Sequence, residues 1–123
     1  MSRIDEILAD ARAGMERVEP GHLPRLQAEG ACVIDIRTDA TRHPEGELPG
    51  ALVIDRLVLE WRLDPDSGAT HALAPGRDEL VIVVCNEGYY SSLAARDLRH
   101  LGFHRATDLI GGFRAYLALA PRA

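Results

Sequence analysis

The most apolar stretch of the chain, Leu-Val-Ile-Val-Val at residues 80–84, constrains its fold more than any other feature. A strand that is apolar at every position, rather than at alternate positions, is covered on both faces, as a central strand of a parallel sheet is. Cys85 and Gly88 follow at once, and the pattern then predicts a helix from about residue 89 to residue 101, which Gly102 ends. The stretch therefore predicts an α/β protein with Cys85 on the turn between its best strand and a helix.

The rest of the chain continues this alternation. Further strands are predicted at 15–18, 31–36, 51–54 and 106–110, and further helices at 21–29, 56–63, 112–118 and, capped by Ser2, near the N-terminus. Residues 37–50 read as a polar loop and 64–78 as a turn-rich stretch. We therefore expect one domain over 1–123, a three-layer fold with a central, mostly parallel five-stranded sheet and helices on both faces, with helix 1–14 packed on it. A ligand site in such a sheet lies beyond the carboxyl ends of the strands.

Composition narrows the functional classes. The net charge is −5, all 14 basic residues are arginine, and no basic run exists, which argues against nucleic-acid or membrane-surface partners. The N-terminus lacks a signal-peptide core and no apolar run has the length of a membrane span, so we expect a cytoplasmic protein. Its two cysteines, Cys32 and Cys85, form no CxxC pair, and we expect neither a metal nor another cofactor.

The turn at Cys85 suits sulfur chemistry. The start of a helix favours a thiolate, and Gly88 lets the turn expose consecutive backbone N–H groups that would hold an anion. Such a turn could hold a thiolate, an oxyanion or a persulfide without a neighbouring histidine. From the pattern alone, a reactive cysteine and an inert, buried cysteine are equally well supported.

Four segments then resemble, in order, the motifs of rhodanese domains. Residues 85–91, Cys-Asn-Glu-Gly-Tyr-Tyr-Ser, resemble the CxxGxxS active-site loop. Residues 33–37 look like the strand that ends in Asp-x-Arg, 46–51 like the GHIPGA segment with Glu47 for histidine, and 109–116 like the late L-x-GG-x-x-A-W motif with Tyr116 for tryptophan. The resemblance extends from about Met15 onward and implies a rhodanese-like fold.

The resemblance also implies an activity. A donor such as thiosulfate or a persulfide would pass sulfane sulfur to Cys85, and an acceptor such as a thiol, cyanide or a protein cysteine would take it away. Cys85 is then the catalytic nucleophile. The substrate-binding residues would be those of the loop together with one basic residue from the preceding motif: Asn86, Glu87, Gly88, Tyr89, Tyr90, Ser91 and Arg37.

Two positions depart from the family pattern. Tyr90 stands where many members have arginine, and Glu87 stands near a position that is basic in some. The loop itself then offers no cation to an anionic donor, and Glu87 is expected to repel one. Tyr89 and Tyr90 either form a wall of the donor pocket or pack in the first helical turn.

Other polar residues have more ordinary interpretations. Arg37 either attracts the donor or, as we favour, forms a structural ion pair with Asp35. Arg42 is expected to be a solvated surface residue rather than part of the pocket. We expect Cys32 in the core and Trp61 to be a packing residue. His100 and His104, four residues apart, are expected on the surface rather than on a metal.

Two other functions remain open. Cysteine-dependent phosphatases and arsenate reductases need an arginine six residues after the cysteine, where this chain has Ser91; its first later arginine is Arg96. A non-catalytic rhodanese module for binding or regulation is the alternative from another class, although inactive members usually lose the cysteine and this chain retains Cys85.

Overall fold

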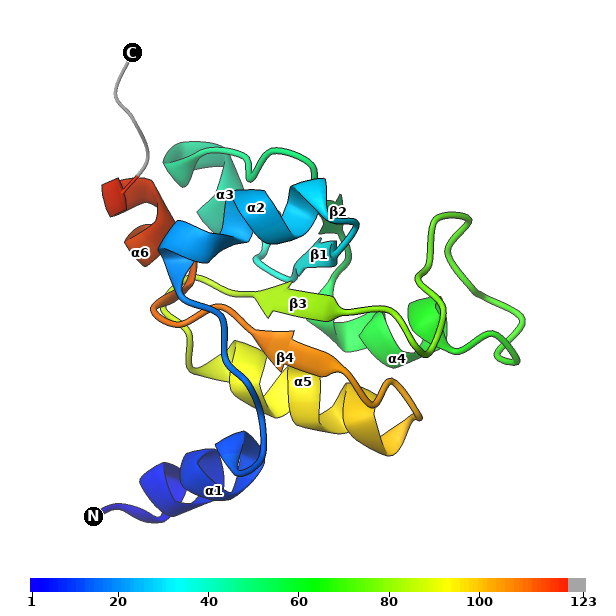
Figure 1. The fold of residues 1–123 in the computed structure, drawn as a ribbon, viewed down its shortest axis with the longest axis horizontal. Helices are drawn as coiled ribbons and strands as arrows, with labels where there is room; N and C mark the ends of the chain where they lie inside the picture. The colour runs from blue at the N-terminus through cyan, green and yellow to red at the C-terminus, as the bar shows by residue number, and fades with distance from the viewer. Residues whose placement is uncertain (120–123) are drawn as a thin grey trace.

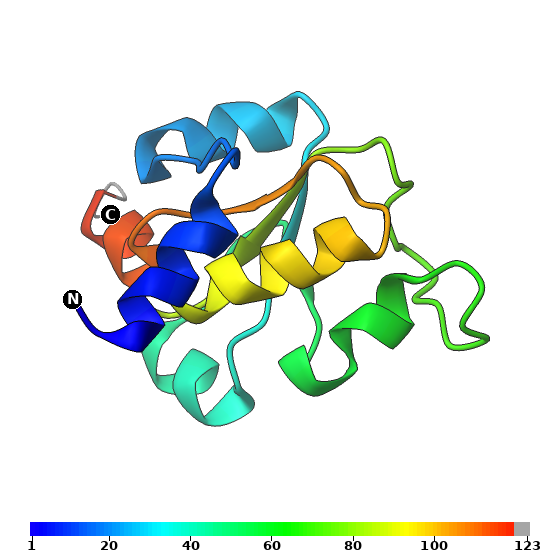
Figure 2. The same cartoon turned by 90° about the horizontal axis from the view of Figure 1, so that it is seen from below.

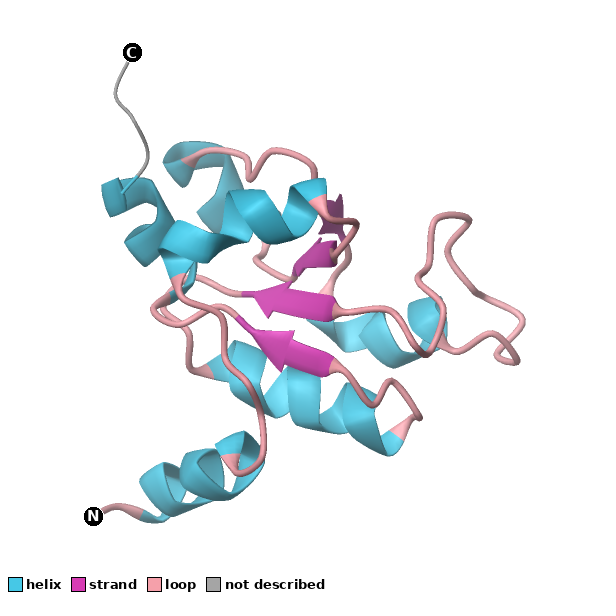
Figure 3. Cartoon of the chain, in the orientation of Figure 1, coloured by secondary structure: helices cyan, strands magenta, loops and turns pink. Residues whose placement is uncertain are grey.

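A sheet of four parallel strands forms the centre of the molecule in the computed structural model, which describes residues 1–119 (Figures 1 and 3). The strands are β1 (Cys32–Asp35), β2 (Leu52–Val53), β3 (Val81–Val84) and β4 (Ala106–Asp108), in the order β2-β1-β3-β4. Cys32 pairs with Val81 and Asp35 with Val84, so β1 and β3 end level with each other. The predicted three-layer α/β fold with a parallel sheet is confirmed.

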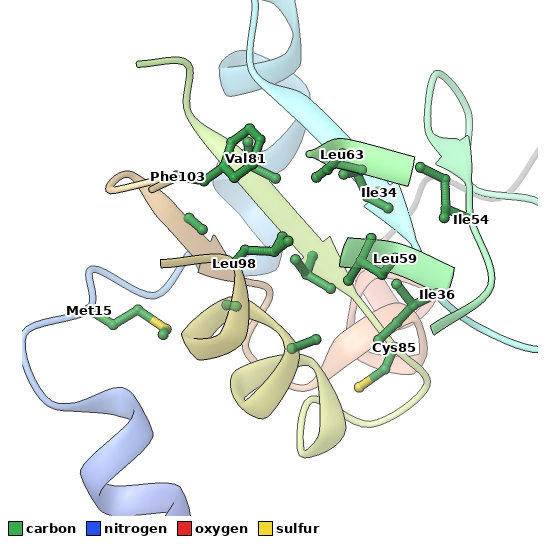
Figure 4. Packing of buried hydrophobic residues seen from close by; sticks show 14 residues of the cluster. Met15, Ile34, Ile36, Ile54, Leu59, Leu63, Val81, Cys85, Leu98 and Phe103 are labelled. Atoms are coloured by element: carbon green, nitrogen blue, oxygen red, sulfur yellow. The ribbon is translucent and has the colours of Figure 1, made fainter. Parts of the chain in front are cut away.

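The central strand β3 is buried at every position, as its uninterrupted apolar sequence predicts. Successive side chains of a strand point to opposite faces of the sheet, so Val81 and Val83 enter one hydrophobic cluster and Ile82 and Val84 the other. Figure 4 shows the first cluster, with Cys85 at its edge. The nucleophile candidate is thus anchored at the end of the best-packed strand.

Helices cover both faces of the sheet. α4 (Leu59–Leu63) and α5 (Tyr90–His100) pack against the first cluster, whereas α2 (Leu23–Ala28) and α6 (Gly112–Leu119) pack against the second. Figure 3 shows the strands between these two layers. The arrangement directs the loops after β1 and β3 to one edge of the sheet.

The N-terminal helix α1 (Arg3–Arg12) lies along α5 (Figure 2). Its start has the predicted cap: the Ser2 hydroxyl accepts from the Asp5 N–H and the Asp5 carboxylate accepts from the Ser2 N–H, each at 3.2 Å. These hydrogen bonds lower the pKa of Asp5. Leu8 and Ala11 are buried, so the helix presents one apolar face to the rest of the chain.

Three local predictions were wrong. Residues 15–18 contribute only one bridge, Val18 to Leu109, so the described sheet has four strands instead of five. The predicted loop 37–50 contains α3 (Asp39–Glu45), capped by Thr38; its polar sequence and Pro44, in the last turn, conceal the helix. Trp61 is 59% exposed, because the short α4 turns Leu59 and Leu63 inward and leaves the residue between them on the outer side.

Within residues 1–119, no helix combines the length and the apolar character needed to span a membrane. The same residues contain no group of three or more His, Cys, Asp or Glu side chains that could hold a metal ion. His104 hydrogen-bonds to Asp78 at 2.8 Å on the surface.

Candidate active site

The sulfur of Cys85 lies at the carboxyl end of β3, inside the turn that leads into α5. Its Sγ accepts hydrogen bonds from the backbone N–H groups of Gly88, at 3.2 Å, and Ser91, at 3.4 Å. The Ser91 hydroxyl lies 3.3 Å from the same sulfur and accepts from the thiol. The residue is only 9% exposed, so the turn wraps the sulfur and leaves a narrow approach to it.

Close backbone packing forces this turn to use glycine. Gly88 has a φ of +85°, and a Cβ there would lie 2.6 Å from the backbone nitrogen of Gly111. A Cβ on Gly112 would likewise lie 2.6 Å from the carbonyl oxygen of Cys85. That oxygen accepts the N–H of Phe113 at 2.9 Å. The late Gly-Gly motif thus acts as a backbone support for the Cys85 turn.

Several N–H groups of the turn have no acceptor. No hydrogen bond within residues 1–119 uses the N–H groups of Glu87, Tyr89 or Tyr90, and Tyr89, at the start of α5, has no side-chain cap. N–H groups at the start of a helix carry partial positive charge and face outward. Together with the two N–H groups on the sulfur, they offer donors to an anion that extends from Sγ.

A cavity of about 330 Å³ opens beside the sulfur. Five of the predicted site residues line it with Cys85: Asn86, Glu87, Tyr89, Tyr90 and Arg37. Gly88 and Ser91 instead contact the sulfur from within the turn. Tyr89 and Tyr90 are 60% and 55% exposed, which favours a role as cavity wall over one in core packing. A larger cavity, of about 530 Å³, lies away from Cys85 near Arg25 and Arg105.

Arg37 is held as a structural ion pair. Its guanidinium donates to both carboxylate oxygens of Asp35, at 2.8 to 3.2 Å, and to the carbonyl of Gly46 at 2.8 Å. It also lies 3.8 Å from the centre of the Phe113 ring. These contacts are the ion pair that the sequence favoured, and they brace the loop after β1 on one side of the cavity.

A second guanidinium at the cavity escaped the sequence analysis. Arg56 lines the cavity and lies 5.6 Å from the centre of the Tyr90 ring. It is oriented by Glu60, at 2.8 Å, and by Asp97, at 2.6 Å. Asp97 is 41 residues away along the chain, so no local motif marks Arg56.

Glu87 has a counter-charge. Its carboxylate lies 3.0 Å from the guanidinium of Arg114 on α6, and Arg114 also binds Glu45 at 2.9 Å. The hydrogen bond with Glu45, and to a lesser extent Glu87, raises the pKa of Arg114. The negative charge at the cavity rim is therefore smaller than the loop sequence suggests.

Asp108 is the other residue that sequence reasoning missed. It is fully buried at the end of β4 and accepts from the hydroxyls of Ser91, at 2.8 Å, and Ser92, at 2.7 Å. Arg17 donates to both of its oxygens, at 2.8 and 3.2 Å. A charged residue inside a short buried strand is unusual and was a signal for such a network.

The remaining predicted residues lie outside the site. Arg42 is buried rather than solvated, a prediction that was wrong because α3 holds it between Asp39, at 2.6 Å, and Glu47, at 3.1 Å. Cys32 packs against the first cluster at the start of β1, and both cysteines are free thiols. Burial, reinforced by Glu79, raises the pKa of Cys32 to about 11.

Comparison with known proteins agrees with this geometry. The model of the rhodanese-like domain family matches residues 19–119. Over 106 residues the chain is 32% identical to thiosulfate sulfurtransferase GlpE of Pseudomonas fluorescens, covering 86% of this chain and 88% of that protein. GlpE of Pseudomonas aeruginosa is 27% identical over the same length.

Solved structures give the same picture. The human single-domain sulfurtransferase TSTD1 is 28% identical with a TM-score of 0.73, covering 85% of this chain and 97% of that one. A Rhodopseudomonas palustris protein of unknown function, described as a possible tyrosine phosphatase, is 25% identical with a TM-score of 0.86 and covers 100% of this chain and 96% of its own.

Proposed function

The chain belongs to the rhodanese-like domain family, and on that premise we propose that it is a sulfurtransferase that carries sulfane sulfur as a persulfide on Cys85. The observation that carries this proposal is the turn around Sγ, where two N–H groups already contact the sulfur and others, among them those of Glu87, Tyr89 and Tyr90, have no acceptor within residues 1–119. A persulfide is anionic and one atom longer than a thiolate. Its outer sulfur would extend toward these free donors.

The first step loads the enzyme. The Cys85 thiolate attacks the sulfane sulfur of thiosulfate, a new S–S bond forms, and the S–S bond of the donor breaks so that sulfite leaves with the electron pair. The curated relatives are named for thiosulfate, which supports it as a donor here. Arg56 at the cavity supplies a cation that the loop itself lacks.

The second step returns the enzyme to its thiolate form. A nucleophile such as cyanide, a thiol or a protein cysteine attacks the outer sulfur, and the S–S bond to Cys85 breaks with the electron pair returning to Sγ. The N–H groups of Gly88 and Ser91 stabilise the thiolate that leaves. The cavity beside Sγ provides a route for a small acceptor.

A pair of cysteine variants tests this function. Cys85→Ser is expected to reduce the transfer of sulfur from thiosulfate to cyanide to the uncatalysed rate, because an alcohol does not form the persulfide. Cys32→Ser is the matched control and is expected to retain turnover, because Cys32 lies at the opposite end of the sheet. Circular dichroism checks that both variants fold. Undiminished turnover by Cys85→Ser would refute the proposal.

The similarity to a possible tyrosine phosphatase favours one rival activity. A cysteine phosphatase needs an arginine that clamps the phosphate oxyanion in two contacts, and Ser91 occupies that position. The two guanidiniums at the cavity, those of Arg37 and Arg56, come from outside this loop, so neither occupies the position that the phosphatase loop requires. We therefore expect no cysteine-dependent release of para-nitrophenol from para-nitrophenyl phosphate, and phosphatase turnover comparable with sulfur transfer would favour the rival.

A binding module without catalysis is the other rival. Such a module would need neither a free thiol nor unpaired N–H groups around it, and residues 1–119 contain both. Our proposal places the protein in a reducing cytoplasm, with a small sulfur donor and a thiophilic acceptor as partners and no nucleic acid or membrane.

A further inference from the structure

Two arginines converge on one carbonyl oxygen of the Cys85 turn. Arg12, at the end of α1, donates to the Gly88 carbonyl at 2.8 Å, and Arg17 donates to the same oxygen at 3.1 Å. They come from 76 and 71 residues away along the chain. Both lie before residue 19, where the match to the family model begins.

These contacts fix the orientation of one peptide group. The described chain has no cis peptide bond, so the Gly88 carbonyl and the Tyr89 N–H point in opposite directions within the plane of their shared peptide group. With the carbonyl held by the two guanidiniums, the Tyr89 N–H faces away from them. That N–H is one of the donors without an acceptor within residues 1–119, and Tyr89 lines the cavity beside the sulfur.

Both guanidiniums are themselves held in place. Arg17 is fixed by two contacts to Asp108, which is fully buried. Arg12 donates its Nε to the Ser92 hydroxyl at 2.9 Å, and that hydroxyl in turn donates to Asp108. Each arginine therefore bridges the Gly88 carbonyl and the Asp108 network through a forked pair of contacts, which the planar guanidinium can make and a single ammonium cannot.

We infer that Arg12 and Arg17 are positioning residues of the sulfur site: they hold the Gly88 carbonyl so that the Tyr89 N–H faces the anion bound at Cys85. The N-terminal segment 1–18 then helps to position the N–H donors that surround the bound anion, although this segment lies outside the residues that the family model matches. This inference deepens the proposed function and rests on it, since the anion in the sulfurtransferase is the donor and then the persulfide. A hydrogen-bond donor that is already fixed in orientation stabilises an anion far more than a donor that must first reorient.

The test compares an anionic with a neutral reagent at Cys85, in the full chain. Iodoacetate and iodoacetamide both alkylate the sulfur and release iodide, and only iodoacetate brings a negative charge to the N–H groups around Sγ. The second-order rate constant for iodoacetate is divided by that for iodoacetamide. This ratio is independent of any change in the reactivity of the thiolate itself, because both reagents depend on it equally. We expect Arg12→Gln/Arg17→Gln to lower this ratio by roughly fivefold to tenfold, and Arg12→Gln alone to lower it by about half as much on a logarithmic scale.

Two controls separate orientation from charge and from general support. Arg99→Gln removes a guanidinium that donates to the carbonyls of Ala106 and Gly14 and makes no contact with the turn among the described residues, so its ratio should stay within about twofold of the parent chain. Arg12→Lys/Arg17→Lys keeps both charges without the forked contacts, and its ratio should fall nearly as far as that of the glutamine variant.

The outcomes are distinct. A ratio unchanged by the glutamine variants, or fully restored by the lysine variants, overturns the inference, the second result because charge alone then suffices. If the double variant does not fold, Arg12→Gln decides, since Arg12 makes no direct contact with Asp108. Neither reagent needs a sulfur donor, so a parent chain that takes no sulfur from thiosulfate or from a low-molecular-weight persulfide refutes the proposed function, while the alkylation ratio still decides the role of the two arginines.

Discussion

The two cysteines of this chain differ in what surrounds their sulfur atoms. The sulfur of Cys85 accepts hydrogen bonds from two backbone N–H groups at the start of α5 and lies beside a cavity. Cys32 packs against aliphatic side chains at the start of β1, and burial together with the nearby Glu79 raises its pKa to about 11. Burial opposes an anionic sulfur at Cys32, whereas the N–H groups around Sγ of Cys85 offer donors to an anion, and for this reason our proposal assigns the nucleophile to Cys85.

The raised pKa of Cys32 predicts a loss of stability at high pH. The folded thiol keeps its proton up to about pH 11, whereas the unfolded thiol loses it near its ordinary value of 9.0. The free energy of unfolding should therefore fall between pH 9 and pH 11, by on the order of 1 kcal/mol once the partial solvation of Cys32 is allowed for.

Urea unfolding under reducing conditions measures this effect. Cys32→Ala is expected to lose the Cys32 part of the decrease between pH 9 and pH 11, because the titrating group is gone. A variant whose stability falls as steeply as that of the parent chain over this range would contradict the assignment.

The pair of Glu87 and Arg114 predicts a small electrostatic effect on thiosulfate. Both side chains are about half exposed, and an exposed pair contributes less than about 1 kcal/mol. Glu87→Gln should therefore raise kcat/KM for thiosulfate by no more than about threefold. Arg114→Gln should lower it by about two- to fivefold at low ionic strength, because Glu87 then lacks its counter-charge.

Salt and a double variant control this experiment. The loss in Arg114→Gln should shrink at high ionic strength, since the rim is solvated, and Glu87→Gln/Arg114→Gln should return close to the parent value. A rise above tenfold in Glu87→Gln would mean that Arg114 does not neutralise it.

At the residue level, the sequence carries a signal where the contacts are local. Cys85, Gly88 and Ser91 lie in one turn, as their sequence motif indicates, and their roles in sulfur transfer stay predictions. Arg56 and Asp108 were missed because the residues that hold them in place are distant in the sequence. Arg56 contacts Asp97, 41 residues away, and Asp108 contacts Arg17, 91 residues away. No spacing rule connects such pairs; the packing of α5 and of the segment around Arg17 against the sheet brings them together.

At the scale of elements, the Cys85 turn depends on a second turn at the start of α6. Gly88 is packed against Gly111, and Gly112 against the carbonyl of Cys85, with no room for a Cβ at either contact. The hydrogen bonds from α6 to the carbonyls of Cys85 and Asn86 tie the two turns together. The position of the sulfur is thus a joint property of β3, α5 and α6.

A pair of glycine substitutions tests this dependence. Gly88→Ala meets both a left-handed φ and a backbone contact of 2.6 Å, so it should lower the free energy of unfolding by more than about 2 kcal/mol and reduce sulfur loading of Cys85 at least tenfold. Gly68→Ala has nearly the same φ, +80°, but open space around its Cβ, and should cost only about 1 kcal/mol and leave loading unchanged. Equal losses in the two variants would contradict the packing argument.

Element prediction succeeded where hydrophobic periodicity was strong and failed where tertiary contacts decide. The apolar run of β3 and the amphipathic pattern of α5 are visible in the sequence, as is the capping box of α1. Helix α3 is short and polar, and it is stabilised by the Thr38 cap and by ion pairs of Arg42. Residues 15–18 were predicted as a strand, but only Val18 among them forms a β-bridge, and its partner is Leu109.

At the scale of the whole molecule, the parallel sheet brings the residues of the candidate site to one edge. Because β1 and β3 end level, the Asp35–Arg37 pair and the Cys85 turn lie on the same edge of the sheet. Helix α1 lies beside α5 (Figure 2), and Arg12 at the end of α1 and Arg17 after it both donate to the Gly88 carbonyl of the Cys85 turn. The cavity beside the sulfur is therefore lined by segments that are distant in sequence and held by one core on each face of the sheet.

The most direct test of this account is the mass of the protein after incubation with thiosulfate and removal of the donor. We predict that the intact chain gains the mass of one sulfur atom, that fragmentation assigns it to the peptide containing Cys85, and that cyanide removes it. Cys32→Ala should gain the same mass and Cys85→Ser none. A persulfide found on Cys32, or a chain that gains no sulfur from thiosulfate or from a low-molecular-weight persulfide, would contradict the central claim.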